Sequence, residues 1–175
     1  VRSPLILNFV GKLAYLIYRG SNIVLVQSQA FVRSIVNMGI NEEKIKYFPN
    51  SAEDLYCEEV KACAPVEIEN LPEGFRIMFA GNIGAAQDFE TILKAAEMTA
   101  NHPDIHWVIL GDGRMYEWVS DQVRERGLEK NFHLMGRYPV ETMPVCFSAA
   151  DAMLVTLKRD PIFALTIPSK VQSYL

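Results

Sequence analysis

A glycine-rich segment after a strand-like run is the part of this sequence with the clearest chemical use. The run Phe75–Ala80 reads F-R-I-M-F-A, and it leads into Gly81-Asn82-Ile83-Gly84 and then into a helical pattern. Free backbone N–H groups at a helix start, helped by the helix dipole, suit a diphosphate. The segment is neither the dinucleotide fingerprint G-x-G-x-x-G nor a P-loop, which needs Gly-Lys-Ser/Thr. A diphosphate site and a tight turn without a ligand both stay open.

Two further segments could hold an anion or a sugar. Gly111-Asp112-Gly113 follows the apolar run I-H-W-V-I-L, and we expect Asp112 to cap the next helix. In Ile167-Pro168-Ser169-Lys170 the proline fits the first turn of a helix, and the serine offers a hydroxyl. Lys170 would then be a cation near a helix N-terminus, which is unfavourable unless an anion lies nearby. This conflict favours a phosphate-binding role for Lys170.

The elements that position these segments alternate between strands and helices. Strand-like runs occur at 75–80, 105–110, 131–135 and 151–156. Short connections between such elements imply right-handed crossovers, and hence an α/β fold with a Rossmann-like parallel sheet and helices on both faces. Ligands of these sheets collect at the carboxyl ends of the strands. Three of the four runs end in glycine there, at Gly81, Gly111 and Gly136.

The segments outside this alternation predict further parts of the molecule. Residues 52–74 lose any regular pattern and are predicted to form a linker. The stretch 5–18 predicts an amphipathic helix, too short for the roughly 20 residues that span a bilayer. Packing on a core and contact with a membrane surface or a lipid-linked substrate both remain open for it. The predicted helix 167–175 lacks a capping signal, so we expect a chain truncated at its C-terminus.

Composition excludes several classes of function. The net charge is −4 and the lysines and arginines form no cluster, which argues against a nucleic-acid partner. The cysteines and histidines show no ligand spacing, so we expect no metal site. The odd number of cysteines is typical of a reduced, cytoplasmic protein. These residues are Cys57, Cys63, Cys146, His102, His106 and His133.

The ordered set of motifs resembles family-4-type glycosyltransferases of the GT-B fold over nearly the whole chain. V-L-V-Q-S-Q-A-F and G-I-N-E-E-K-I-K-Y-F-P-N-S resemble the end of their first domain. F-A-G-N-I-G, W-V-I-L-G-D-G, F-H-L-M-G-R and A-A-D-A-M-L-V resemble strand ends of their second domain. I-P-S-K-V-Q-S-Y-L resembles the helix start that grips the donor. The most similar subgroup occurs in O-antigen and capsule clusters, and includes transferases proposed to move N-acetyl-L-fucosamine.

The resemblance implies an organisation and an activity. Residues 1–51 would end the acceptor-side Rossmann-like domain, 52–74 would be the interdomain linker, and 75–175 would form most of the nucleotide-sugar-binding domain. The enzyme would be a hexosyl-transferring glycosyltransferase of cell-surface polysaccharide biosynthesis, retaining and metal-independent. It would need no cofactor, and its partners would be a UDP-sugar, a glycan or polyprenyl-linked acceptor, and the cytoplasmic membrane surface. Because most of the acceptor domain is missing, the fragment alone would be inactive.

The same resemblance assigns roles to individual residues. Gly81 to Gly84 would lie against the diphosphate, and Arg137 and Tyr138 would border the nucleobase. Lys170 would stabilise the leaving diphosphate as the catalytic residue. The predicted donor-binding residues are Gly81, Asn82, Gly84, Gln87, Gly111, Arg137, Tyr138, Ser169, Lys170 and Ser173.

Departures from the family pattern leave alternatives open. Asn82 and Gln87 stand where many members carry arginine and lysine, and Ser173 stands where many carry glutamate. Either another cation replaces them, or the enzyme is weakened. The replacement candidates are Lys170, Arg159 and Arg137. A GT-B nucleotide-sugar epimerase or phosphorylase, and a noncatalytic nucleotide-binding module, are the competing functions.

Overall fold

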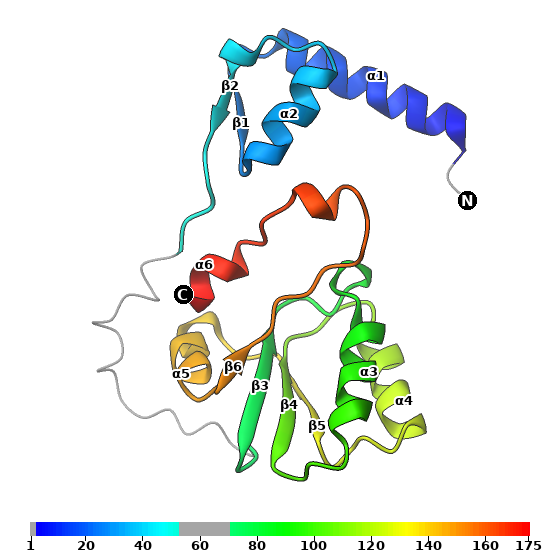
Figure 1. Ribbon diagram of the computed structural model, residues 1–175, viewed down its shortest axis with the longest axis vertical. Coiled ribbons are helices and arrows are strands. Elements are labelled where there is room, and N and C mark those ends of the chain that lie inside the picture. The colour runs from blue at the N-terminus through cyan, green and yellow to red at the C-terminus, as the bar shows by residue number, and fades with distance from the viewer. Residues whose placement is uncertain (1–2, 53–70) are drawn as a thin grey trace. The chain divides into compact units, whose positions relative to one another are not determined.

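The computed structural model describes residues 3–52 and 71–175, which form two compact units (Figure 1). Among the described residues, one unit contains 3–51 and 160–169. The other contains 52, 71–159 and 170–175. Residues 53–70, which make up most of the predicted linker and include Cys57 and Cys63, lie outside the described residues.

The second unit is built on a four-stranded parallel sheet with the strand order β5-β4-β3-β6. Helices cover both of its faces, with α3 and α4 on one side and α5 on the other (Figure 1). The predicted fold class, an α/β parallel sheet between helices, is therefore confirmed. The elements are β3 (Phe75–Ala80), α3 (Phe89–Thr99), β4 (Ile105–Leu110), α4 (Tyr116–Glu125), β5 (Phe132–Gly136), α5 (Met143–Ser148), β6 (Ala152–Met153) and α6 (Lys170–Tyr174).

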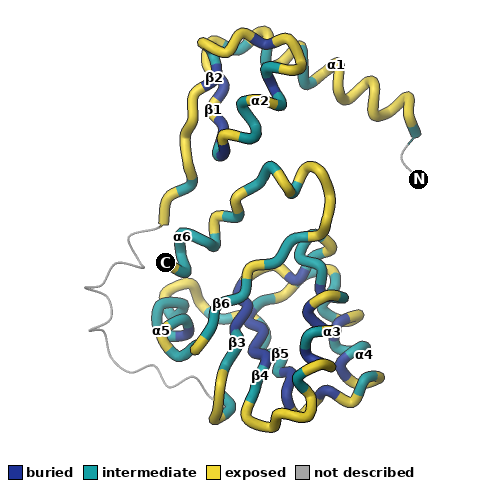
Figure 2. Tube along the Cα trace, in the orientation of Figure 1, coloured by how far each residue is buried: buried dark blue, intermediate teal, exposed yellow. Residues whose placement is uncertain are grey.

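Alternation along the two central strands builds a separate core on each face. Phe79 and Ile109 join the cluster under α3 and α4. Their neighbours Met78 and Val108 join the cluster that includes residues of α5 and α6. Because side chains of a strand point to opposite faces in turn, strands buried on both sides read as continuous apolar runs. Figure 2 shows this as a band of buried positions along β3 and β4.

The edge strand β6 is shorter than its sequence predicts. The run 151–156 pairs with β3 only through Ala152 and Met153. Beyond it, Leu154 donates from its backbone to Met78 O at 2.7 Å, and the chain then leaves the sheet. It continues along the loop after β3, where the Thr156 hydroxyl donates to Gln87 O at 2.6 Å. The second half of the run 151–156 therefore crosses that loop as a strap and is not part of the sheet.

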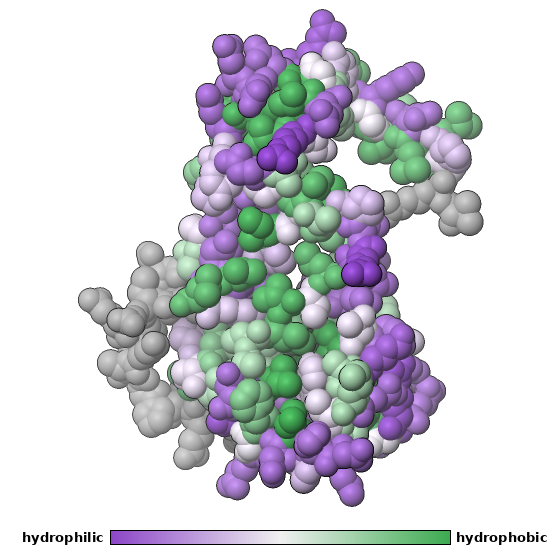
Figure 3. Space-filling view, in the orientation of Figure 1, coloured by the Kyte–Doolittle hydropathy of each residue, from purple (hydrophilic) through white to green (hydrophobic). Residues whose placement is uncertain are grey.

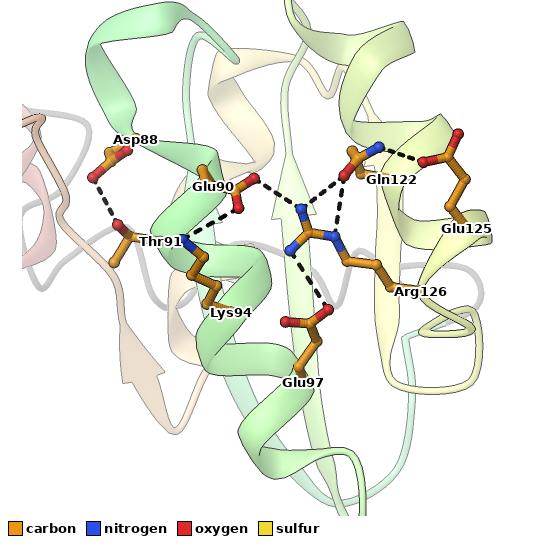
Figure 4. A network of polar contacts seen from close by, with 8 residues as sticks. All are labelled: Asp88, Glu90, Thr91, Lys94, Glu97, Gln122, Glu125 and Arg126. Atoms are coloured by element: carbon orange, nitrogen blue, oxygen red, sulfur yellow. Dashed lines mark hydrogen bonds and ion pairs between the residues drawn. The ribbon is translucent and has the colours of Figure 1, made fainter.

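Arg126 joins the end of α4 to α3 (Figure 4). Its guanidinium donates to Glu90 at 2.8 Å and to Gln122 at 2.7 Å, and it lies 3.5 Å from a carboxylate oxygen of Glu97. The hydrogen bond from Arg126 holds the pKa of the Glu90 carboxyl below its usual value. Only 17% of the Arg126 side chain is exposed, so this contact fixes the spacing of the two helices.

The first unit is a small layer of two helices on a two-stranded parallel sheet. Its apolar core consists of strand residues and of Ile35 and Ile40. Ser28 caps α2 by accepting from Phe31 N, and its hydroxyl donates to Leu165 O at 2.5 Å. This bond attaches residues 160–169 to the unit. The elements are α1 (Pro4–Gly20), β1 (Val24–Val26), α2 (Gln29–Asn37) and β2 (Ile45–Tyr47), with short 3-10 helices at Glu42–Lys44 and Phe163–Leu165.

Helix α1 is amphipathic, as predicted, but no residue of it is buried. Tyr15 and Tyr18 pack against the core of the unit, while most apolar side chains of the helix are exposed. Figure 3 shows some of them at the surface. No helix among the described residues is long and apolar enough to cross a membrane. The exposed apolar residues of α1 are Leu5, Ile6, Leu7, Phe9, Val10, Leu13, Leu16 and Ile17.

Candidate functional site

Three glycines lie at the carboxyl ends of β3, β4 and β5, where they extend the sheet's hydrogen bonding. Gly81 N donates to Leu110 O at 2.9 Å, and Gly111 N donates to Gly136 O at 2.7 Å. A Cβ on Gly111 would collide with the backbone carbonyl of Gly81, and the φ of 134° at Gly111 also excludes most side chains. Glycine is therefore required where these two strand ends approach each other.

A cavity of about 290 Å³ opens at these strand ends. It combines the guanidinium of Arg137, the carboxylate of Asp112 and the ring of Tyr138 with glycine backbone. The lining is thus mixed, with polar groups at fixed places beside the apolar side chains of Leu110 and Met143. Fixed polar groups of this kind orient a small planar ligand such as a nucleobase. The structure brings five predicted donor-binding residues together here. The lining consists of Gly81, Asn82, Leu110, Gly111, Asp112, Arg137, Tyr138 and Met143.

The loop after β3 is held by the fully buried Ile83. Its N–H donates to Asp112 O at 2.8 Å, and its carbonyl accepts from Met115 N at 3.0 Å. A 3-10 helix (Ala85–Gln87) follows, and α3 starts only at Phe89. The N–H groups of Ala85 and Ala86 donate to no group in the described part of the chain. These two donors stay available to an anion.

Gly84 and Gln87 lie apart from the lining of this cavity. A Cβ on Gly84 would stand 2.7 Å from the Asn82 amide nitrogen and 3.2 Å from Gln87 Oε1. Gly84 lines a second hollow of about 200 Å³, to which Lys158 contributes a cation. Lys158 was not predicted as a site residue, because it belongs to no recognisable motif. It follows the run 151–156, and its backbone N–H donates to Ala86 O at 2.8 Å.

Lys170 opens α6 and reaches the end of β3. Its ammonium nitrogen lies 3.7 Å from the centre of the Phe79 ring, a cation–π contact. The nitrogen is buried and has no hydrogen-bond acceptor among the described residues. This burial lowers the pKa of the Lys170 ammonium to about 8. A desolvated cation supported only by an aromatic ring is well prepared to receive an anion.

The surroundings of Lys170 correct two details of the sequence analysis. Helix α6 begins at Lys170, so Pro168 precedes the helix and does not occupy its first turn. With five residues the helix carries little dipole, and the unfavourable position of Lys170 comes from burial instead. Ser173 is half-buried on α6. Ser169 is exposed and belongs to the first unit, so its donor-binding role stays a prediction.

Asp112 does not cap α4, contrary to expectation. The helix starts at Tyr116 with Met115 as its N-cap, because the turn from Gly113 to Tyr116 delays it. The Asp112 carboxylate instead accepts from the N–H of Gly113 at 2.6 Å. Asp112 is thereby held in the wall of the cavity.

The sheet brings two of the histidines that are far apart in the sequence close together. His106 and His133 on β4 and β5 approach to 3.1 Å between Nδ1 and Nε2, a contact that the sequence spacing concealed. Cys146 is buried, and burial raises the pKa of its thiol. In the described ranges, no three His, Cys, Asp or Glu side chains gather as a set that could hold a metal ion.

Comparison with solved structures shows which known proteins share this fold. The fold is similar to that of HepE from Anabaena, solved in complex with UDP-glucose, with a TM-score of 0.65 and 17% sequence identity. The match covers 84% of this chain and 42% of HepE. Such low identity supports the fold alone.

Two curated proteins are similar in sequence. WcaI of Escherichia coli K12, whose name assigns it to colanic acid biosynthesis as a glycosyl transferase, is 26% identical over 85% of this chain and 37% of its own length. WbjE of Pseudomonas aeruginosa, named as a glycosyltransferase, is 34% identical over 58% of this chain and 25% of its own length. The chain thus spans about a third of the first relative and a quarter of the second. Residues 66–165, more than half of the chain, match the family described as glycosyl transferases group 1, and the chain therefore belongs to that family.

Proposed function

We propose that the second unit is the donor-binding part of a glycosyltransferase that acts in cell-surface polysaccharide biosynthesis. The observation that carries this proposal is the cavity at the carboxyl ends of β3, β4 and β5, lined by Arg137 and Tyr138. Ligands of parallel α/β sheets bind at this end. The complex of HepE with UDP-glucose and the name of WcaI support the same reading.

In the proposed arrangement, the nucleobase occupies the cavity and the diphosphate lies along the loop from Gly81 to Ala86. Glycosyl transfer places negative charge on the departing diphosphate, and donors already oriented toward that charge lower the barrier. Lys170 and the N–H groups of Ala85 and Ala86 are the donors that this chain offers. Because they would carry the charge in place of a divalent ion, we propose a metal-independent transferase without a cofactor. The family resemblance adds the proposal that the transferase retains the anomeric configuration.

The finer assignments follow from the family resemblance. We propose a UDP-linked hexose as donor, with N-acetyl-L-fucosamine as the first sugar to test. The acceptor would be a glycan or polyprenyl-linked sugar of an O-antigen or capsule, reached at the cytoplasmic face of the membrane. The domain roles proposed are acceptor side for residues 1–51, linker for 52–74 and donor side for 75–175.

The deciding experiment is isothermal titration calorimetry of the 175-residue chain with UDP, GDP and ADP, each in EDTA and in Mg²⁺. We expect UDP to bind best and equally well in both buffers. Arg137→Ala should weaken UDP binding about tenfold, the loss expected for a charge-assisted hydrogen bond. Arg124→Ala is the matched control, because that guanidinium is exposed on α4, away from the cavity lining.

Two results would contradict the proposal. Absence of binding for all three nucleotides would remove the donor-binding role altogether. Binding that needs Mg²⁺ would leave the donor role intact and refute the metal-independent part.

A further inference from the structure

On its edge toward β6, strand β3 has one residue whose backbone groups find no hydrogen-bond partner in β6. Along this edge, Arg76 O accepts from Asp151 N at 3.0 Å, and Met78 O accepts from Leu154 N at 2.7 Å. Backbone groups of alternate residues point to the same neighbouring strand in a sheet. Ala80 is therefore the next residue whose N–H and C=O need partners on this side, and β6 has already ended.

The hydroxyl of Tyr174 supplies both partners. It accepts from Ala80 N at 3.1 Å and donates to Ala80 O at 2.9 Å. Its ring packs edge-on against Phe147 of α5, with centroids 5.0 Å apart. Tyr174 thus completes the sheet edge with a side chain, and the helix that carries it is fixed to the end of β3.

Lys170 lies four residues before Tyr174, on the same side of α6. Its ammonium contacts the ring of Phe79, the residue directly before Ala80, and it lies next to Gly81, the residue directly after. A helix of five residues is unstable by itself, since nucleation costs more than so few hydrogen bonds return. The position of Lys170 therefore depends on the anchor at Tyr174.

We propose that Tyr174 is a positioning residue, whose hydroxyl sets the ammonium of Lys170 beside Gly81 for contact with the donor diphosphate. The last part of this proposal rests on the proposed function. The positioning itself does not, because it concerns the unliganded chain.

The first test uses NMR on the unliganded chain. The Phe79 ring should shift the Lys170 Hε resonances upfield, and Tyr174→Phe should remove most of that shift while keeping the ring contact with Phe147. Tyr116→Phe is the matched control, because its half-buried ring belongs to the other core and its hydroxyl makes no hydrogen bond within the described ranges. In the wild-type chain, the Ala80 amide should exchange with solvent as slowly as that of Val108.

The second test measures UDP affinity. Tyr174→Phe and Lys170→Met should each weaken UDP binding about tenfold, the size expected for a lost hydrogen bond to a charged group. The double variant should bind no more weakly than Lys170→Met alone, because both changes remove one contact. In the wild-type chain, affinity should fall as the pH rises through about 8, where Lys170 loses its proton, and in Tyr174→Phe this dependence should flatten.

The outcomes separate the two proposals. An unchanged Lys170 shift in Tyr174→Phe, or fast exchange of the wild-type Ala80 amide, would refute the positioning role whatever UDP does. If Tyr174→Phe loses the upfield shift of Lys170 but the wild-type chain binds no UDP, the positioning role is supported and the proposed function is refuted. If Tyr174→Phe fails to fold, the exchange rate of Ala80 in the wild type still decides.

Discussion

The ammonium nitrogen of Lys170 lies 3.2 Å from the point where a Cβ on Gly81 would stand. Gly81 also has a φ of 136°, a conformation that side-chain-bearing residues rarely adopt. The missing side chain therefore has two effects. It allows the backbone to turn out of β3, and it leaves room for the cation of α6 beside the loop that we propose to hold the diphosphate.

Substitution of Gly81 by alanine tests both effects. We expect Gly81→Ala to lower the free energy of unfolding by about 1–3 kcal/mol through backbone strain. It should also weaken UDP binding, because Lys170 must move away. The control is Gly127→Ala, where φ is 65° and nothing lies within 4 Å of the added carbon. Urea unfolding should show a loss for both variants and calorimetry a binding defect for Gly81→Ala alone. If both variants bind UDP with equal affinity, Gly81 has no role in UDP binding.

Replacement of Lys170 should change stability and affinity in opposite directions. Burial lowers the pKa of Lys170 to about 8 in the folded chain, below the ordinary lysine value of 10.5. Between these values the unfolded chain binds more protons, so the free energy of unfolding should rise with pH across that window. Below pH 8 the buried charge carries its full desolvation cost.

Lys170→Met removes this titration and keeps an unbranched side chain, slightly shorter than that of lysine. At pH 7 we expect higher stability than wild type, a flat profile from pH 8 to 10.5, and weaker UDP binding. Lys94→Met serves as the control, since Lys94 is exposed on α3 and pairs only with Glu90 in the described structure. Thermal unfolding across this pH range measures the effect. A loss of stability in Lys170→Met at pH 7 would show that the cation–π contact outweighs the cost of burial.

The contact between His106 and His133 should make the chain sensitive to acid. Burial, and then the nearby His106, hold the pKa of His133 below its usual value. The unfolded chain thus takes up this proton at higher pH than the folded chain, and stability should fall as the pH drops below about 6.5. His133→Phe should reduce the slope between pH 6.5 and 5, whereas exposed His102→Gln should leave it unchanged. An equal slope in wild type and His133→Phe would assign the acid sensitivity to other groups.

Arg126 should matter for stability and leave the ligand untouched. Arg126→Met leaves Glu90, Glu97 and Gln122 without their shared partner between α3 and α4, so the midpoint of thermal unfolding should fall by several degrees. Arg124→Met, at an exposed ion pair on the same helix, should change it little. UDP affinity should be the same in both. If Arg126→Met binds UDP more weakly, the spacing of α3 and α4 affects the shape of the cavity.

The sheet was predictable because its sequence signals are local. Phe75–Ala80 and Ile105–Leu110 are strands as predicted, since apolar runs bounded by glycine favour buried parallel strands. Gly127 ends α4 in a similarly local way: its φ is 65°, its N–H donates to Arg124 O, and the N–H of Leu128 donates to Val123 O. Each of these features depends on neighbours in sequence.

What escaped prediction depends on contacts between distant residues. Strand β6 ends early, and Tyr174, more than twenty residues later, completes the edge of β3 in its place. Asp112 is not a helix cap because Met115 bonds to Ile83 of another loop. The cluster of Gly81, Gly111 and Arg137 was predicted through the family resemblance, whereas Lys158 matched no motif. Contacts between residues that are distant in sequence form only when the chain folds, and the sequence pattern does not reveal them.

The return of residues 160–169 to the first unit has a consequence for biosynthesis. The bond between Ser28 and Leu165 joins residues 137 positions apart, and Asn50 similarly donates to Ile167 O. At ribosomal rates of about 5–20 residues per second, the partner of Ser28 emerges on the order of ten seconds after it. During this interval the first unit lacks one of its segments, and the second unit still lacks α6 (Lys170–Tyr174). Residues 160–175 are therefore expected to complete both units, first the one that contains Ser28 and then the one that contains Ala80.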